Sequence, residues 1–306
     1  MKPNFFIVGA AKAGTTSLYH YLSQHEEVFC PNVKEPNYYA SVSAEKASVY
    51  EEPKAGNFYH RKVINNYNTY LSLYEDANKE PVLLDSSPSY LWDKNAAAHI
   101  YKDNPKAKIL IVLRNPVERA FSHFLMDVRS GIQAEMDFKK ALEKDCKHQP
   151  YTWGNAHLYV GLGLYHDQVK RYLDMFGPSQ VKVMIYEDLF SNLESGLKDI
   201  LNFIEVDTNV DINIHQAHNT FFMPKNKIYR KLIQYKSHLK VYSNRLPENV
   251  KKRLKKSMFE DSTKPSLSQE TYEAIFKYFN EDYLKTKQLL LKEFQLDVNY
   301  DIVPKV

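Results

Sequence analysis

Cysteine is scarce in this 306-residue chain: Cys30 and Cys146 are the only two, and they stand far apart. Two isolated thiols argue against a disulfide framework and against a cysteine-ligated zinc site. No stretch approaches the roughly 20 apolar residues that a membrane-spanning helix needs. The first apolar run, residues 5–11, is also too short for the core of a secretory signal. We therefore expect a cytoplasmic protein without a membrane span.

The chain also lacks internal repeats, low-complexity tracts and linkers rich in glycine and serine. Its 43% hydrophobic and 25% charged residues are typical of a soluble globular protein. A chain of this length can bury a large core. The simplest partition is a single domain over residues 1–306.

Positive charge is concentrated in one segment, residues 224–257. This segment holds twelve lysines and arginines but one acid, Glu248, which gives it a charge of +11. The net charge of the chain is +4, so the remaining residues together carry −7. A basic arm on an acidic body indicates a polyanionic partner or substrate. The alternative is a solvated pair of helices, because Ile228, Leu232 and Tyr235 recur at near-helical spacing and the lysines would then face water.

Apolar periodicity predicts an α/β fold. Short apolar runs predict buried strands at Phe5–Val8, Val82–Leu84, Ile109–Leu113 and Val181–Ile185. Amphipathic stretches predict helices at Ser17–His25, Val117–Ser130, Met136–Lys144, Leu164–Met175, Leu193–Ile204 and again from about Ser266. Helical crossovers between strands imply a P-loop-like central parallel sheet flanked by helices on both faces. The basic segment would belong to a mostly helical C-terminal portion.

The sequence GAAKAGTTS directly follows the first predicted strand and begins at Gly9. A strand, a glycine loop and a helix that begins near Thr15 direct backbone N–H groups and the helix dipole at one point, which favours a phosphate. Nucleotide-binding P-loops carry a lysine after the second glycine, whereas here the lysine is Lys12, before Gly14. From inside the loop, Lys12 would stabilise charge on a departing phosphate oxygen. The alternative is a strand-to-helix turn without a ligand.

A second motif, LRNPVERAFS, ends another predicted strand with Arg114. Pro116 is well suited to the first turn of a helix, and Ser122 would lie on that helix. Arg114 and Ser122 are therefore candidates for a second phosphate site, with the guanidinium donating two hydrogen bonds. Arg114 could instead form only an ion pair. Two phosphate sites on one sheet indicate a ligand with two separated phosphate groups.

In these two motifs the chain resembles the sulfotransferases that use 3'-phosphoadenosine 5'-phosphosulfate (PAPS). Further segments match in the same order: KEPNYY at 34–39 resembles the K-E-P-x-[FY]-[FY] of carbohydrate sulfotransferases, and SPSY at 87–90 resembles their S-P-x-Y. The segments GLY at 163–165 and EDL at 187–189 are also similar to family segments. The resemblance runs from Phe5 to at least Asn202.

The resemblance implies a role for each matching residue. The 5'-phosphosulfate would be bound by Lys12, Ala13, Gly14, Thr15, Thr16 and Ser17, and the 3'-phosphate by Arg114 and Ser122. Glu35 matches the general base of the heparan-sulfate-type members, and with Lys12 it forms the catalytic pair. A carboxylate is the right group to take the proton of a sugar hydroxyl, although a solvated surface acid is the alternative for Glu35.

Three residues are weaker candidates for contact with the acceptor: Lys34, Asp85 and His123. Heparan-sulfate-type relatives carry a lysine before S-P-x-Y, where this chain has Ser86. This departure makes Asp85 an additional candidate for acceptor contact or for an alternative base. His123 directly follows Ser122, although a histidine on a helix is commonly structural.

We expect a sulfotransferase that moves a sulfuryl group from PAPS to a hydroxyl of a carbohydrate, with an anionic polysaccharide or other glycan as acceptor. We expect no metal, because a sulfuryl group carries less negative charge than a phosphoryl group, and no nucleic-acid partner. One alternative is a P-loop kinase in which Asp85 holds magnesium. Another is a non-enzymatic polyanion-binding protein built on residues 224–257, which leaves both phosphate motifs unexplained. The oligomeric state stays open.

Overall fold

The computed structural model describes residues 1–40, 64–130, 133–147, 158–214, 222–224, 259–261 and 265–300. Its strands are β1 Phe5–Gly9, β2 Val28–Phe29, β3 Val82–Ser86, β4 Lys108–Leu113, β5 Val181–Ile185, β6 Phe222–Pro224 and β7 Phe259–Asp261. Its helices are α1 Thr15–Leu22, α2 Tyr67–Ser72, α3 Ser89–Trp92, α4 Ala96–Asp103, α5 Pro116–Ser130, α6 Phe138–Lys147, α7 His166–Phe176, α8 Tyr186–Ser191, α9 Leu193–Ile204, α13 Gln269–Phe276 and α14 Asn280–Phe294. Apart from Pro224, the basic segment 224–257 lies outside the described residues, and its helices stay a prediction.

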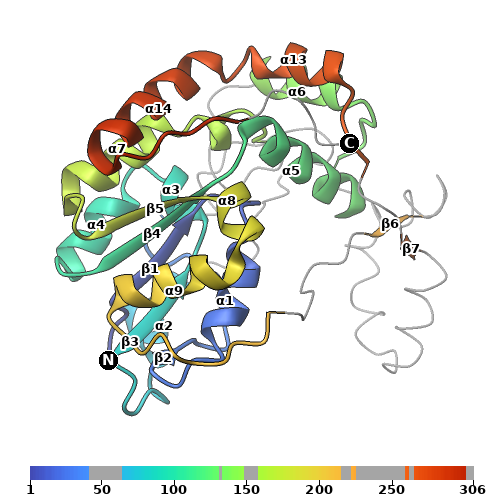
Figure 1. Cartoon of the computed structure of the whole chain (residues 1–306). Helices are drawn as coiled ribbons and strands as arrows, with labels where there is room; N and C mark the ends of the chain where they lie inside the picture. Colours follow the sequence, from blue (N-terminus) through green and yellow to red (C-terminus); the bar gives the residue numbers. More distant parts are fainter. Residues whose placement is uncertain are drawn as a thin grey trace.

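Five strands form a parallel sheet in the order β2-β3-β1-β4-β5 (Figure 1). The four strands expected from apolar runs are confirmed. The edge strand β2 was not predicted, because two residues carry no periodic signal. β6 and β7 pair as a separate antiparallel ribbon.

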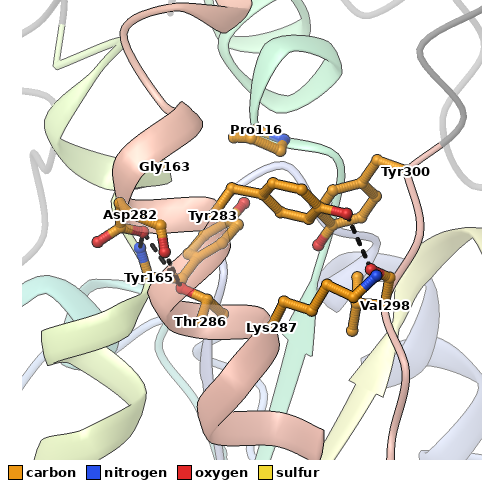
Figure 2. A pocket seen from close by; sticks show the side chains of 9 residues that line it. All are labelled: Pro116, Gly163, Tyr165, Asp282, Tyr283, Thr286, Lys287, Val298 and Tyr300. Carbon is orange, nitrogen blue, oxygen red and sulfur yellow. Dashed lines mark hydrogen bonds between the residues drawn. The ribbon is translucent and has the colours of Figure 1, made fainter.

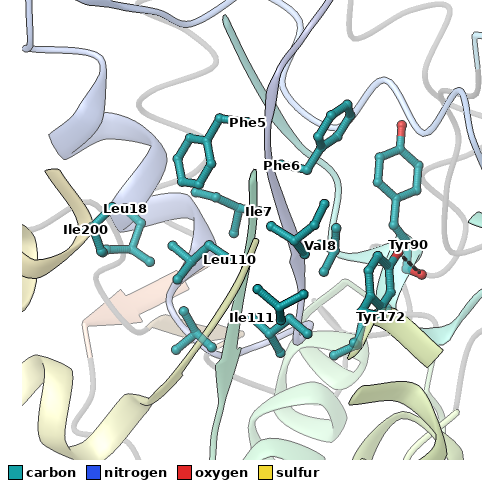
Figure 3. Close-up of a cluster of buried hydrophobic side chains, with 14 of the residues drawn as sticks. Phe5, Phe6, Ile7, Val8, Leu18, Tyr90, Leu110, Ile111, Tyr172 and Ile200 are labelled. Carbon is teal, nitrogen blue, oxygen red and sulfur yellow. Dashed lines mark hydrogen bonds between the residues drawn. The ribbon is translucent and has the colours of Figure 1, made fainter. Parts of the chain in front are cut away.

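Helices cover both faces of this sheet, as predicted. Every residue of β1 is buried, which is typical of a parallel strand packed on both sides. Figure 3 shows Leu18 of α1 and Ile200 of α9 on one side of the central strands, and Tyr90 and Tyr172 on the other. The two tyrosines come from α3 and α7. The fold is therefore the predicted α/β architecture.

The parallel arrangement brings the segments that follow the strands to one edge of the sheet. In spatial order these segments carry Glu35 after β2, Ser87 after β3, Lys12 after β1, Arg114 after β4 and Glu187 after β5. In the sheet, β2 and β3 lie on one side of β1, whereas β4 and β5 lie on the other. Open α/β sheets bind ligands in the crevice where the strand order reverses in this way, here between the loops that follow β1 and β4.

Asn115 fixes the point at which α5 begins. Its side-chain oxygen accepts hydrogen bonds from the backbone N–H groups of Val117 at 3.0 Å and Glu118 at 3.3 Å. Its amide nitrogen donates to the Tyr272 hydroxyl at 2.5 Å. Pro116 occupies the first helical position, where its missing N–H is no loss, so the predicted helix start is confirmed.

Replacing Asn115 with alanine should lower the free energy of unfolding by about 1–2 kcal/mol, because two amides of α5 lose their acceptor. Urea denaturation monitored by circular dichroism measures this loss. Asn115→Asp is the matched control: it keeps an oxygen for both amides and should stay close to the wild type. An equal loss in both variants would contradict the capping role.

Candidate active site

The loop between β1 and α1 adopts the strand-turn-helix form that the sequence predicts. Gly14 has φ +79°, and a Cβ there would lie 2.5 Å from the ring of Phe190 on α8. The backbone conformation therefore favours glycine, and a larger residue would also have to displace that ring. No side chain of the described residues caps α1, so the N–H groups of its first turn, at Thr15, Thr16 and Ser17, remain available to an anion.

Lys12 projects from this loop toward α5. Its Nζ lies 3.3 Å from Sδ of Met126, a weak acceptor. Burial, reinforced by the neighbouring charge of Arg129, lowers the pKa of Lys12 to about 8. A cation in these surroundings would be stabilised by an anion. The adjacent Ala13 is buried and its N–H donates to Ala10 O at 3.1 Å, so a ligand contact from Ala13 stays a prediction.

Arg114 joins the two predicted phosphate motifs. One guanidinium nitrogen, Nη1, donates to the carbonyl of Lys12 at 3.0 Å. The guanidinium also lies over the ring of Tyr186, 4.4 Å from its centre, and Nη2 is 3.7 Å from Glu118. Nε is buried and has no hydrogen-bond partner among the residues that the structure describes. The side chain is thus anchored on three sides while one donor stays unsatisfied.

Residues from distant parts of the chain hold the turn at Arg114 and Asn115. The Tyr165 hydroxyl donates to Arg114 O at 2.9 Å, and Glu187 accepts from Asn115 N at 3.1 Å. Burial raises the pKa of Glu187. Tyr165 belongs to the GLY segment and Glu187 to the EDL segment, so both segments support the turn at Arg114 and Asn115.

Behind this turn lies a small cavity lined by Tyr165, by Asp282 and Thr286 of α14, and by Tyr300 (Figure 2). Asp282 accepts from the N–H of Tyr165 at 2.6 Å and from the hydroxyl of Thr286 at 3.3 Å. The volume of the cavity is about 10 Å³, room for no more than one water molecule. It cannot hold a nucleotide.

Glu35 and Lys34 follow β2, on the opposite side of Lys12 from Arg114. The ammonium of Lys34 contacts the carboxylate of Glu35. The negative charge of Glu35 acts on the pKa values of both Lys12 and Asp85, so the carboxylate lies within electrostatic range of the loop lysine. The structure therefore brings the two predicted catalytic residues near each other; their roles stay predictions.

The remaining candidates are Asp85, His123 and Ser122. Asp85 has no exposed surface, and its carboxylate accepts three hydroxyl hydrogen bonds, which differs from an open carboxylate that holds magnesium. His123 is buried, with Nε2 3.5 Å from Asp127. Ser122 is partly exposed on α5. Their contacts with donor or acceptor stay predictions.

Sequence reasoning missed Tyr186, which supports the Arg114 guanidinium, and Asn115, which caps α5. The Asn-Pro dipeptide at the start of α5 was a usable signal for Asn115, because asparagine before a helix-starting proline is a frequent cap. Tyr186 had no such signal, since its place beneath Arg114 depends on the pairing of β4 with β5.

A family model described as the sulfotransferase domain matches residues 2–287. The chain belongs to the sulfotransferase family. A solved sulfotransferase from Alicyclobacillus acidocaldarius superimposes with a TM-score of 0.71 at 27% identity, covering 95% of this chain and 96% of that one. Its fold and family agree with those derived above.

Curated relatives of this sulfotransferase act, by their names, on carbohydrates. Carbohydrate sulfotransferase 15 of Mus musculus is 22% identical over 245 residues, which cover 67% of this chain and 44% of that protein. Bifunctional heparan sulfate N-deacetylase/N-sulfotransferase 2 of Bos taurus is 24% identical over 217 residues, covering 67% of this chain and 22% of that protein. This sulfotransferase thus spans less than half the length of either relative.

Within the ranges that the structure describes, no helix of this sulfotransferase is both long and apolar enough to cross a bilayer. The same residues contain no group of three histidine, cysteine or carboxylate side chains arranged to hold a metal ion.

Proposed function

We propose that this protein transfers a sulfuryl group from PAPS to a hydroxyl group of a carbohydrate acceptor. The observation that carries this proposal is the junction of the two phosphate motifs, where Arg114 donates to the carbonyl of Lys12. Glu35 lies on the other side of the lysine loop from Arg114, and we propose that it acts as the general base. The family membership of the chain supports the same reaction.

The side chains present fit a donor with two phosphate groups. The first-turn amides of α1 and the ammonium of Lys12 would hold the phosphosulfate end. Arg114, with its unsatisfied Nε, and Ser122 would hold the 3'-phosphate. Two anionic groups would in this way meet the two cations that the sheet brings together.

Bound PAPS would supply the sulfuryl group as an activated electrophile. Glu35 would take the proton of the acceptor hydroxyl while the acceptor oxygen forms its bond to sulfur. Lys12 would stabilise the phosphate oxygen that keeps the electron pair of the breaking S–O bond. The proton would end on Glu35, the sulfuryl group on the acceptor oxygen and the electron pair on the departing phosphate, so the step balances without a redox partner.

For the acceptor we propose an anionic polysaccharide or other glycan. Two observations favour it: the charge of +11 in residues 224–257, and the carbohydrate acceptors in the names of the relatives. One of those relatives is named as an N-sulfotransferase, so an amine is the competing acceptor. The cytoplasmic location and the independence from metal remain proposals.

Replacing Arg114 with alanine should weaken the binding of adenosine 3',5'-bisphosphate by tenfold or more, since each lost charge-assisted hydrogen bond is worth about 1.5–3 kcal/mol. Isothermal titration calorimetry in EDTA measures the affinity. Lys170→Ala, which removes an exposed cation paired with Asp174, is the matched control and should bind like the wild type. Binding of ATP that requires magnesium would instead support the kinase.

The affinity for adenosine 3',5'-bisphosphate should fall as the pH rises through about 8, because Lys12 loses its proton there rather than near 10.5. Below that pH the ammonium is charged and binding is at its strongest. Lys12→Arg, which stays protonated throughout, should flatten the profile between pH 7 and about 10. Titrations at a series of pH values test this, and parallel profiles for both proteins would exclude Lys12 as the titrating group.

Glu35→Gln should lower kcat by about 100-fold or more while leaving adenosine 3',5'-bisphosphate affinity unchanged, because only proton removal is lost.

Transfer from radiolabelled PAPS is measured with heparosan, dextran, chitosan and p-nitrophenol as acceptors. We expect heparosan, an anionic polysaccharide, to react fastest. The matched control for Glu35→Gln is Glu26→Gln, which neutralises an exposed acid and should transfer like the wild type. Reaction of chitosan alone would support an amine acceptor, and reaction of p-nitrophenol alone would exclude a carbohydrate enzyme.

A further inference from the structure

The loop that carries Glu35 has an unusual backbone. Glu35 has φ +59° and Asn37 has φ +54°, on either side of Pro36. Asparagine tolerates this left-handed conformation, but glutamate adopts it at a cost of about 1–2 kcal/mol. Hydrogen bonds must therefore hold the loop in this conformation.

Asn37 supplies the first of these contacts. It is 2% exposed, and its side-chain Nδ2 donates to the carbonyl of Glu35 at 2.7 Å. Its Oδ1 accepts from the Ser89 hydroxyl at 2.6 Å, and its backbone N–H donates to Ser87 Oγ at 3.2 Å. One buried side chain thus connects the Glu35 backbone to the SPSY segment that follows β3.

Asp85 orients the hydroxyl to which Asn37 is bound. Ser87 donates its only proton to Asp85 Oδ1 at 2.6 Å, so its oxygen is left to accept from Asn37. The other carboxylate oxygen, Oδ2, accepts from the hydroxyls of Tyr70 at 2.7 Å and Tyr90 at 2.9 Å. Asp85 is thereby fixed within β3, in the middle of the core.

We propose that Asp85, Ser87 and Asn37 form a hydrogen-bonded relay that positions Glu35 for proton removal. They are positioning residues, because their hydrogen bonds lead from Asp85 through Ser87 and Asn37 to the backbone of Glu35. This gives Asp85 a role different from the acceptor contact expected from the sequence. The inference rests on the proposed function of Glu35 as general base.

Two variants disconnect the relay at different points. Asn37→Gly removes the side-chain hydrogen bonds to Glu35 and Ser89 but keeps the freedom to adopt a positive φ. Ser87→Ala removes the hydroxyl between Asp85 and Asn37. Ser86→Ala is the matched control, because Ser86 is also buried and one position away, yet its hydroxyl has no hydrogen-bond partner in the described part of the chain.

The assay measures the release of adenosine 3',5'-bisphosphate from PAPS in the presence of heparosan. This release reports every transfer of the sulfuryl group, whether to the sugar or to water. We expect kcat to fall about 10- to 100-fold in Asn37→Gly and in Ser87→Ala, since small misplacements of a catalytic group have effects of that size. KM for PAPS should not change, and Ser86→Ala should match the wild type. Wild-type kcat in both relay variants would overturn the relay, and so would an equal loss in Ser86→Ala.

A double-mutant cycle separates the relay from the proposed function. In a Glu35→Gln background, Asn37→Gly should have no additional effect, because a residue that acts only through the base has nothing left to position. The same fold-loss in both backgrounds would overturn the relay while leaving Glu35 as the base. Full activity of Glu35→Gln alone would instead overturn the proposed base, whatever the relay variants do.

Discussion

The parallel pairing of β1 with its neighbours β3 and β4 is the constraint on which the site depends. Because all five strands of the sheet run the same way, every segment that leaves a carboxyl end starts at the same edge. Glu35, Lys12 and Arg114 are far apart in the sequence and belong to three such segments. The hydrogen bond from Arg114 to the carbonyl of Lys12 connects two of them where the strand order reverses.

This geometry concentrates positive charge at a partly buried place. Burial is the main cause of the lowered pKa of Lys12; Arg129 and Arg114 lower it further, while Asp127 and Glu35 oppose them. These cations repel one another, and burial removes the water that would screen their charges. An anionic donor would offset both effects, so the same arrangement that strains the free protein would favour binding.

The side opposite Arg114 is built differently. There the acidic Glu35 is held by a neutral hydrogen-bonded framework of amide and hydroxyl groups that ends at Asp85 in the core. Burial raises the pKa of Asp85 to about 6, and its hydroxyl partners partly compensate by stabilising the charged form. The candidate site thus has a cationic half around Lys12 and Arg114, which we propose for the donor, and a carboxylate half around Glu35, which we propose for the acceptor.

Local sequence determined much of this protein. Short apolar runs identified β1, β3, β4 and β5, and the periodic stretches identified α5 and α9, because burial on a sheet imposes these patterns. The glycine loop and the Arg-Asn-Pro turn made Lys12 and Arg114 candidate site residues, and the resemblance of the K-E-P segment to carbohydrate sulfotransferases made Glu35 another. These features depend on neighbours in the chain, so they can be read without a structure.

Contacts between distant segments were decided only by the tertiary structure. β2 exists because Val28 and Phe29 pair with β3, and Tyr186 lies beneath Arg114 because β5 pairs with β4. Asp85 looked like a residue for a ligand, yet the hydroxyls of Tyr70 and Tyr90 enclose its carboxylate. A linear pattern reports how a residue relates to its own strand or helix. Which side chains surround it depends on the order of strands in the sheet, and that order follows from packing of the whole chain.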